Sequence, residues 1–254
     1  MRNSEQYVTP ALSTSGQATG AYEIKFLLPN SAADDVLSLA RSHLEPDPNS
    51  DPAFGDGYHV NSLYLDTPNF DTYHRTDGFR RKKYRLRRYG LGTSVMLECK
   101  AKARGLVKKR RTTVPSGDLS YLLHETSPPN WCGEWYHEKL KQRDLVPACN
   151  VSYRRVARVG MGAEGPIRFT VDRDLRCQRV EAYAVPGVVD GACLLDGKSI
   201  VEMKFCVAMP SIFKTIVHEF ALTPQKVSKF RRSMEECYQL SSASASATST
   251  CQSA

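Results

Sequence analysis

The sequence predicts an α+β protein: an antiparallel eight-stranded β tunnel or barrel with a polar, cationic lumen, whose apolar outer faces are packed by helices. Three observations lead to this fold class. About eight segments alternate polar and apolar side chains with a period of two, which is typical of strands. Five or six others have helical periodicity. Most strands carry charge on one face, and a closed barrel lets those faces surround a lumen while the apolar faces pack outside.

The first expected elements are a strand and a helix. In the strand at residues 21–28, three apolar side chains share one face, and Glu23 and Lys25 share the other. A proline ends this strand, and Ser31 can cap a helix at 32–44. A second strand and a short helix are expected next, at 58–66 and 67–76.

Three basic strands occupy the middle of the chain, at 79–89, 95–102 and 107–114. Between Arg80 and Arg111 there are 14 Lys or Arg and one carboxylate, whereas the whole chain has a formal net charge of +8. Like charges that face one another across strands are destabilising. Such a face favours a polyanionic ligand, because Arg forks match phosphate oxygens and Lys supplies point charge. A merely solvated basic face is the alternative.

The second half of the chain mixes both element types. Residues 117–145 are expected to form two helices separated by paired prolines. Strands are expected at 150–158, 167–171 and 199–205, each with a polar face opposite an apolar one. The last two helices are expected at 209–222 and 224–240.

Composition sets the domain limits and the compartment. Residues 1–19 and 241–254 are rich in small polar residues and are expected to be a disordered leader and tail, which leaves one domain at 20–240. No apolar run has the length of a signal peptide or a membrane span. The eight cysteines lack metal-site spacing and are expected to be reduced thiols of a cytoplasmic protein.

The tunnel interior is expected to combine many cations with a few carboxylates. This mixture suits phosphate oxygens together with a divalent metal, because a hard cation takes carboxylate oxygens and keeps substrate phosphates as its other ligands. The chain has no G-x-x-x-x-G-K-[ST] loop, which excludes a P-loop enzyme. The expected interior residues are Glu23, Lys25, Arg85, Arg87, Glu98, Lys100, Arg155, Arg168, Glu202 and Lys204.

Seven short motifs follow one another in order. They are Tyr22-Glu23-Ile24-Lys25-Phe26, Tyr84-Arg85-Leu86-Arg87-Arg88-Tyr89-Gly90, Glu98-Cys99-Lys100, Tyr153-Arg154-Arg155-Val156-Ala157, Arg168-Phe169-Thr170-Val171-Asp172, Glu202-Met203-Lys204-Phe205 and Lys226-Val227-Ser228-Lys229-Phe230. Over about residues 20–240 they resemble the polyphosphate-polymerase (VTC) domain of the vacuolar transporter chaperone family. That domain belongs to the triphosphate tunnel metalloenzymes, which include the CYTH triphosphatases, and the resemblance implies an antiparallel eight-stranded tunnel.

The resemblance also implies a reaction. A metal-dependent phosphotransferase of this family moves the terminal phosphate of ATP onto a growing polyphosphate chain and releases ADP, with Mn²⁺ or Mg²⁺ as cofactor. Pyrophosphate is a further expected ligand. Carried over to this sequence, catalytic phosphate contacts are expected at Lys25, Arg85, Arg87, Lys100, Arg155, Arg168, Lys226 and Lys229, and the metal at Glu202. Substrate contacts are expected at Glu23, Glu98, Lys108, Arg110, Tyr153 and Lys204, with the register of Lys108 and Arg110 open by one residue.

Two other functions stay open. An inorganic or nucleoside triphosphatase could use the same tunnel with water as acceptor. Such enzymes more often show Glu-x-Glu-x-Lys in the first strand, where this chain has Ala21 two residues before Glu23. A non-catalytic polyanion- or RNA-binding protein could stack bases on the tyrosines beside the arginines. Carboxylates among the cations would repel a nucleic-acid backbone, so no nucleic-acid partner is expected.

Overall fold

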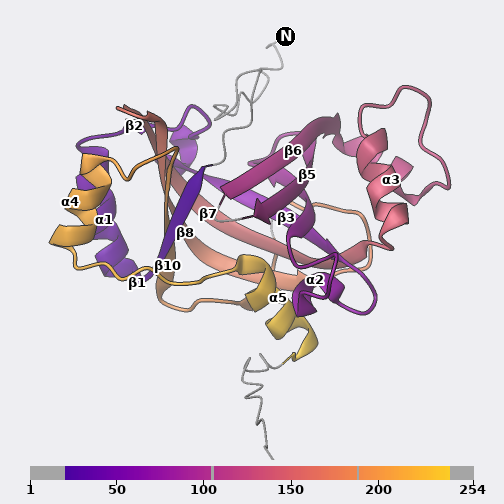
Figure 1. Ribbon diagram of the computed structural model, residues 1–254. Coiled ribbons are helices and arrows are strands. Elements are labelled where there is room, and N and C mark those ends of the chain that lie inside the picture. The colour runs from indigo at the N-terminus through magenta and orange to yellow at the C-terminus, as the bar shows by residue number, and fades with distance from the viewer. Residues whose placement is uncertain (1–20, 104–105, 188, 241–254) are drawn as a thin grey trace, which may run out of the picture.

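A computed structural model of the protein describes residues 21–103, 106–187 and 189–240. The expected leader at 1–19 and tail at 241–254 lie outside the described residues. One antiparallel sheet forms the centre of the molecule, with the strand order β1-β10-β8-β7-β3-β4-β5-β6 (Figure 1). These strands are β1 (Tyr22–Pro29), β3 (Gly57–Asp66), β4 (Lys82–Tyr89), β5 (Ser94–Ala103), β6 (Leu106–Pro115), β7 (Val146–Gly162), β8 (Gly165–Arg179) and β10 (Lys198–Phe205).

All eight expected strands are present, and the α+β class is confirmed. The two central strands, β7 and β8, are much longer than expected and meet in a tight hairpin at Gly162 and Gly165. Glycines and prolines at the ends of these strands conceal their length from a pattern search, because such residues normally mark breaks. Two short strands pair with these long ones: β2 (Glu45–Pro46) with β7, and β9 (Ala192–Cys193) with β8.

The helices are shorter than expected. They are α1 (Asn30–Arg41), α2 (Asp71–His74), α3 (Glu134–Gln142), α4 (Ser211–Glu219) and α5 (Lys229–Tyr238), with 3₁₀ turns at Pro52–Phe54 and Ser116–Leu123. The 3₁₀ segment replaces the first of the two α-helices expected in 117–145. The last helix begins at Lys229, not 224, because the Ser228 side chain caps it by accepting a hydrogen bond from the Arg231 amide.

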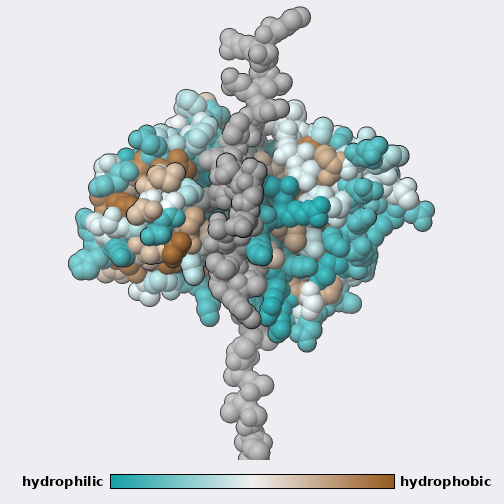
Figure 2. Space-filling view, turned by 45° about the horizontal axis from the view of Figure 1, so that its top comes forward, coloured by the Kyte–Doolittle hydropathy of each residue, from teal (hydrophilic) through white to brown (hydrophobic). Residues whose placement is uncertain are grey.

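Three apolar clusters hold the helices on the sheet. In the first, Phe26 and Phe169 pack under α1 and α4, which Figure 1 shows side by side at one end of the sheet. In the second, Leu86 and Leu97 pack with Tyr136 of α3. Over α1 and α4 the surface is partly hydrophobic, whereas the opposite half of the face in Figure 2 is mostly hydrophilic.

Helix α5 differs from the expectation that helices cover only the outer faces. Its Phe230 and Met234 join a cluster with Val151 and Leu175, which also contains Tyr153, a residue of the inner face. Figure 1 shows α5 beside α2 at the lower opening of the curled sheet. The lumen is therefore apolar where α5 occupies it and charged beyond, and the first turn of α5 reaches the charged part.

The sheet is curled but not closed by hydrogen bonds in the part of the chain that the structure describes. Strands β1 and β6, at the two ends of the strand order, lie near each other without a hydrogen-bonded register. An ion pair bridges the gap instead, with Lys100 of β5 placed 3.0 Å from Glu23 of β1. None of the described helices has the length and apolar character needed to cross a bilayer.

Candidate active site

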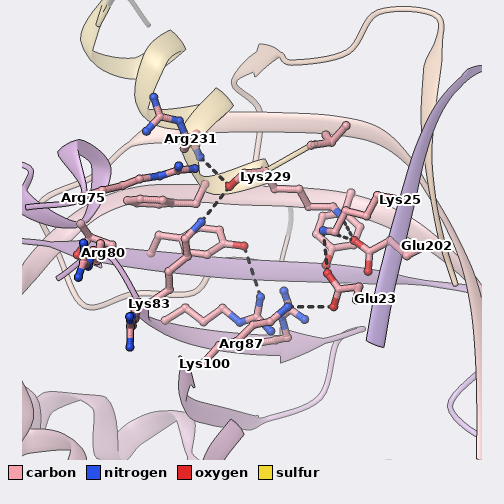
Figure 3. Close-up of a pocket in the computed structure, with 18 of the residues that line it drawn as sticks. Glu23, Lys25, Arg75, Arg80, Lys83, Arg87, Lys100, Glu202, Lys229 and Arg231 are labelled. Carbon is pink, nitrogen blue, oxygen red and sulfur yellow. Dashed lines mark hydrogen bonds and ion pairs between the residues drawn. The ribbon is translucent and has the colours of Figure 1, made fainter. Parts of the chain in front are cut away.

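A cavity of about 530 Å³ lies inside the curled sheet. Alternation along five strands points charged side chains into it, and the start of α5 contributes Ser228, Lys229, Phe230 and Arg231. Ten of the residues expected at the site line this cavity: Glu23, Lys25, Arg85, Arg87, Lys100, Tyr153, Arg155, Glu202, Lys204 and Lys229. Figure 3 labels Glu23, Lys25, Arg87, Lys100, Glu202 and Lys229 among them.

Three other expected residues lie apart from the cavity wall. Glu98 is fully buried behind it, with an oxygen 2.6 Å from the Arg85 Nε, and also pairs with Lys109. Arg168 donates to the Tyr58 hydroxyl at 2.9 Å and pairs with Asp47. Lys226 is exposed in the loop before α5. Glu98 and Arg168 thus have protein partners already.

The last two, Lys108 and Arg110, lie one residue out of register with the inner face. Glu98 and Lys100 of β5 face Arg111 and Lys109 of β6, so Lys109 shares their side of the sheet. Arg110 points outward and stacks on the Trp135 ring of α3, 4.1 Å from its centroid. Because Arg110 packs on that indole outside the sheet, its neighbour Lys109 must point to the inner face.

At the edge formed by β1 and β10, two carboxylates interleave with two amines, and Lys100 of β5 and Lys229 of α5 also reach them. The strand register places Lys25 opposite Glu202 and Glu23 opposite Lys204. The Lys25 amine lies 2.9 Å from Glu202 and 3.1 Å from Glu23. Burial works to raise the pKa of Glu202, but the charges of Lys229 and Lys25 outweigh it and hold that pKa well below its usual value. The pKa of Glu23 is also lowered, against its burial, mainly by Lys204. Both carboxylates are ionised.

Asp172 of β8 is a buried anchor that the sequence analysis did not select. It accepts two hydrogen bonds from Arg155, at 2.6 and 2.7 Å, and lies 2.6 Å from the Lys229 amine. Lys229 also reaches Glu202 at 3.1 Å, so one amine links β8, β10 and α5. The alternation along the strand could have identified it, because Asp172 shares a strand face with Thr170 and Arg168.

The opposite wall carries Arg85 and Arg87 of β4. Arg87 is 4% exposed and donates to the Ser62 hydroxyl at 2.9 Å. Among the described residues, no carboxylate lies within ion-pair distance of it. Burial would raise the pKa of the neighbouring Tyr89, but the positive charges of Arg87 and Lys109 lower it to about 7. The field at this wall is therefore strongly positive.

Five further cations line the cavity and were missed: Arg75, Arg80, Arg81, Lys83 and Arg231. Of these, only Lys83 could have been found from the pattern, because it shares a strand face with Arg85 and Arg87. Arg75 follows α2 in a left-handed conformation, φ 62°, and the others lie on a loop and a helix without periodic signal.

The donor set at Glu23 and Glu202 fits a hard divalent cation. Mg²⁺ and Mn²⁺ are commonly bound by one or two carboxylates, with substrate phosphates and water as the other ligands. Within the described ranges no group of three or more His, Cys, Asp or Glu is placed to hold a metal alone. A cation here would therefore depend on the phosphates of a ligand.

This arrangement can neutralise an extended chain of phosphates. Lys25, Arg85, Arg87 and Lys100 supply charge from different strands of the wall, and the opening supplies more. Phosphoryl transfer needs positioning and charge neutralisation from the protein and little covalent chemistry. The geometry is suited to that task.

Comparison with known proteins gives a family match. The family model of the VTC domain matches residues 20–238. A comparison with curated proteins finds no match. Three solved structures are similar in part. PH1819 from Pyrococcus horikoshii OT3 has 13% identity and a TM-score of 0.48, and the match covers 85% of this chain and 99% of that one. HpAC1 from Hippeastrum, described as a candidate adenylyl cyclase with a dominant triphosphatase activity, has 15% identity and a TM-score of 0.48 over 85% of this chain and 96% of that one. A candidate adenylate cyclase from Bacillus halodurans has 12% identity and a TM-score of 0.49 over 82% of this chain and 95% of that one.

Proposed function

Because this chain belongs to the VTC domain family, we propose that it is a metal-dependent phosphotransferase that moves the terminal phosphate of ATP onto a growing inorganic polyphosphate chain and releases ADP. The observation that carries the proposal is the cavity, whose walls combine cations from β1, β4, β5, β7 and β10 with two ionised carboxylates. Its free thiols support a reducing, cytoplasmic compartment.

Each group has a role in this reaction. Arg87, buried and without a carboxylate partner among the described residues, binds a phosphate and stabilises the charge that develops on it during transfer. Asp172 positions Arg155 and Lys229 so that their remaining donors face the cavity. Glu202 and Glu23 would hold Mg²⁺ or Mn²⁺, which would neutralise phosphate oxygens and fix the orientation of the triphosphate.

The cations at the opening support a polymeric acceptor. A triphosphate can be neutralised by the inner wall alone, yet Arg75, Arg80 and Arg231 add positive charge to the lining beyond it. Arg80 and Arg231 each have one carboxylate, Asp77 and Glu235, at 3.7 Å. A hydrolase needs only water there, whereas a polymer needs a track for its own charge. The same inner wall would serve a triphosphatase, so the acceptor has to be tested directly.

Phosphorus NMR of the purified protein with ATP and Mn²⁺ or Mg²⁺ tests the proposal. We expect ADP and lengthening phosphate chains. Orthophosphate as the only product would establish a hydrolase in place of a polymerase, and no turnover would leave a binding protein. Parallel binding of polyphosphate and single-stranded RNA over a salt series would then identify the polyanion.

A further inference from the structure

Lys83 and Ser228 form a pair inside the cavity that the transfer described above does not use. Lys83 lies on β4 and Ser228 precedes α5, 145 residues away in the chain, yet the Lys83 amine is 3.0 Å from the Ser228 hydroxyl oxygen. Both residues line the cavity, and Figure 3 shows the Lys83 amine pointing toward the start of α5. The amine lies over the ring of Phe230, 5.0 Å from its centroid, in a cation–π arrangement.

The surroundings of Lys83 favour its neutral form. In the described part of the chain no carboxylate lies within ion-pair distance of this amine. The charged groups that affect it most are cations: Lys100 of β5, Lys25 of β1, Arg75 after α2 and Arg231 of α5. Glu23 and Glu202 line the same cavity but pair with other lysines. Burial, followed by these charges, lowers the pKa of Lys83 to about 7. An amine in such a setting is a competent base near neutral pH.

Ser228 is placed to carry a phosphoryl group. Its oxygen is the cap of α5 and accepts a hydrogen bond from the Arg231 amide at 3.3 Å. A phosphate attached to this oxygen would lie at the positive end of the helix, with the free amides of the first turn beside it. The next residue, Lys229, contacts the carboxylate chosen for the metal, so the hydroxyl lies close to the expected position of the triphosphate.

We propose that Ser228 is a nucleophile, with Lys83 as its base, and that it takes the terminal phosphoryl group of a bound nucleoside triphosphate to form a phosphoserine. This rests on the proposed function for its donor, ATP, and for the acceptor of its second step. The Lys83 amine takes the hydroxyl proton, Ser228 Oγ bonds to the terminal phosphorus, and ADP leaves with the electrons of the broken phosphorus–oxygen bond. In a second step a terminal oxygen of the acceptor takes the phosphoryl group, and Lys83 returns the proton to Oγ.

Two consequences separate this route from direct transfer. Direct in-line transfer inverts the configuration at phosphorus once, whereas transfer through Ser228 inverts it twice and so retains it. The formation of phosphoserine also needs the neutral amine, and bound phosphates raise the pKa of Lys83 above its value in the free protein. The rate of phosphorylation should therefore rise with pH and level off above pH 7.

The experiment mixes the full chain with ATP carrying a labelled terminal phosphate, quenches in acid and measures protein-bound label by intact mass and peptide mapping. We expect one phosphoryl group on Ser228, which unlabelled pyrophosphate or polyphosphate then removes. Lys83→Arg keeps the charge but not the base, and it should slow labelling about 10²- to 10⁴-fold, the usual range for a general base.

Matched variants distinguish chemistry from helix capping. Ser228→Asn retains a good capping side chain and should melt like the parent protein, but it cannot be phosphorylated. Ser228→Thr retains both the cap and the hydroxyl and should be labelled. If chains grow at the parental rate in Ser228→Asn, or with inversion at phosphorus, the nucleophile is refuted while the polymerase stands. If Ser228 is labelled but no chain grows, the phosphoserine stands and the proposed polymerase fails.

Discussion

At the scale of single residues, Arg87 and Arg88 are neighbours with opposite surroundings. Arg87 enters the cavity, whereas Arg88 lies on the other side of β4, near Gly187. A surface that attracts polyanions by net charge alone would treat the two residues alike. A site built on one face of the strand would not, so these adjacent arginines offer a matched pair for mutagenesis.

We expect Arg87→Ala and Arg85→Ala each to lower kcat/KM by roughly ten- to a hundredfold, because hydrogen bonds to charged groups are worth about 1.5–3 kcal/mol. Arg88→Ala should cost several-fold at most, through screened attraction over distance. The measurement is kcat/KM for all three variants at one ionic strength. Equal losses at the three positions would rule out the cavity as the site. Arg85→Ala should also reduce stability, since Glu98 loses a buried partner.

Glu202→Gln tests the metal. This variant should lose turnover while it still binds nucleotide, because a hard divalent cation needs the anionic oxygen and the surrounding amines do not. Lys25 and Lys229 lose a shared counter-ion, so the variant should also be destabilised, by up to about 3–5 kcal/mol for a broken buried pair. Turnover rates measured over a manganese titration test the first effect, and denaturant unfolding tests the second. Parental turnover would remove Glu202 from the metal site.

Sequence reasoning at this scale identifies which residues are charged and inward, but not which are already paired. Glu98 and Arg168 both have the expected orientation, yet each is held by a protein partner away from the cavity wall. Partner choice depends on the curl of the sheet, which brings Asp47 of the β2 region to Arg168. A period of two contains no information about such distant contacts.

At the scale of elements, the register of β6 determines the roles of its four consecutive cations. Lys109 pairs with Glu98 on the inner side, and Arg110 stacks on Trp135 outside. Alternation alone leaves two registers possible, and the docking of α3 decides between them. The same limit applies to α5, whose apolar stripe identifies a packed helix without showing that it packs inside the curl.

Arg110→Ala should therefore affect stability and leave catalysis unchanged. Loss of the cation–π contact should cost about 0.5–1 kcal/mol of the free energy of unfolding at an exposed site. Lys109→Ala should instead weaken triphosphate binding about fivefold, or roughly 1 kcal/mol, because Glu98 then draws more on Arg85. Calorimetric titration with tripolyphosphate and denaturant unfolding compare the two variants. A larger loss of affinity in Arg110→Ala would contradict the register.

At the scale of the whole molecule, the eight antiparallel strands agree with expectation. The expected closure of the sheet into a tunnel is not completed by hydrogen bonds among the described residues. Hydrogen-bonded closure depends on the sum of strand twists and on the length of β7 and β8, and neither can be read from short periodic windows. The charged lumen remains, and an ion pair links the edge strand β1 to β5, the strand next to the other edge.

The charge of the lumen makes stability depend on pH and ligand. Burial and neighbouring charges lower the pKa of Lys83 to about 7 and, with burial again the first cause, that of Lys100 to about 8. A lysine in the unfolded chain titrates near pH 10.4. Between about pH 7 and 10 the unfolded chain therefore binds more protons than the folded one, so these lysines make the free energy of unfolding rise with pH over that range.

A ligand that binds only the folded protein should reverse this trend. At a hundredfold excess over Kd, tripolyphosphate should add about 2.7 kcal/mol, or roughly 5–10 °C in Tm for a domain of this size. The increase should shrink from pH 7 to 9.5 as the cavity loses protons. Melting curves at constant ionic strength test this, with sodium chloride as the control. In Lys83→Met the increase in Tm should depend less on pH. Equal shifts from chloride and tripolyphosphate would indicate a merely solvated basic face.

The carboxylates inside the lumen make it selective for the valence of an anion. Glu23, Glu202 and Asp172 already neutralise Lys25 and Lys229 at 2.6–3.1 Å. An entering anion must exchange with these tethered groups, whose effective concentration is high. A monovalent ion exchanges with one of them and gains little, whereas a linear polyanion exchanges with several through one connected backbone. The protein thus resembles an ion-exchange resin supplied with its own counter-ions, and we expect it to hold chloride and orthophosphate weakly and to retain phosphate chains more firmly as they lengthen.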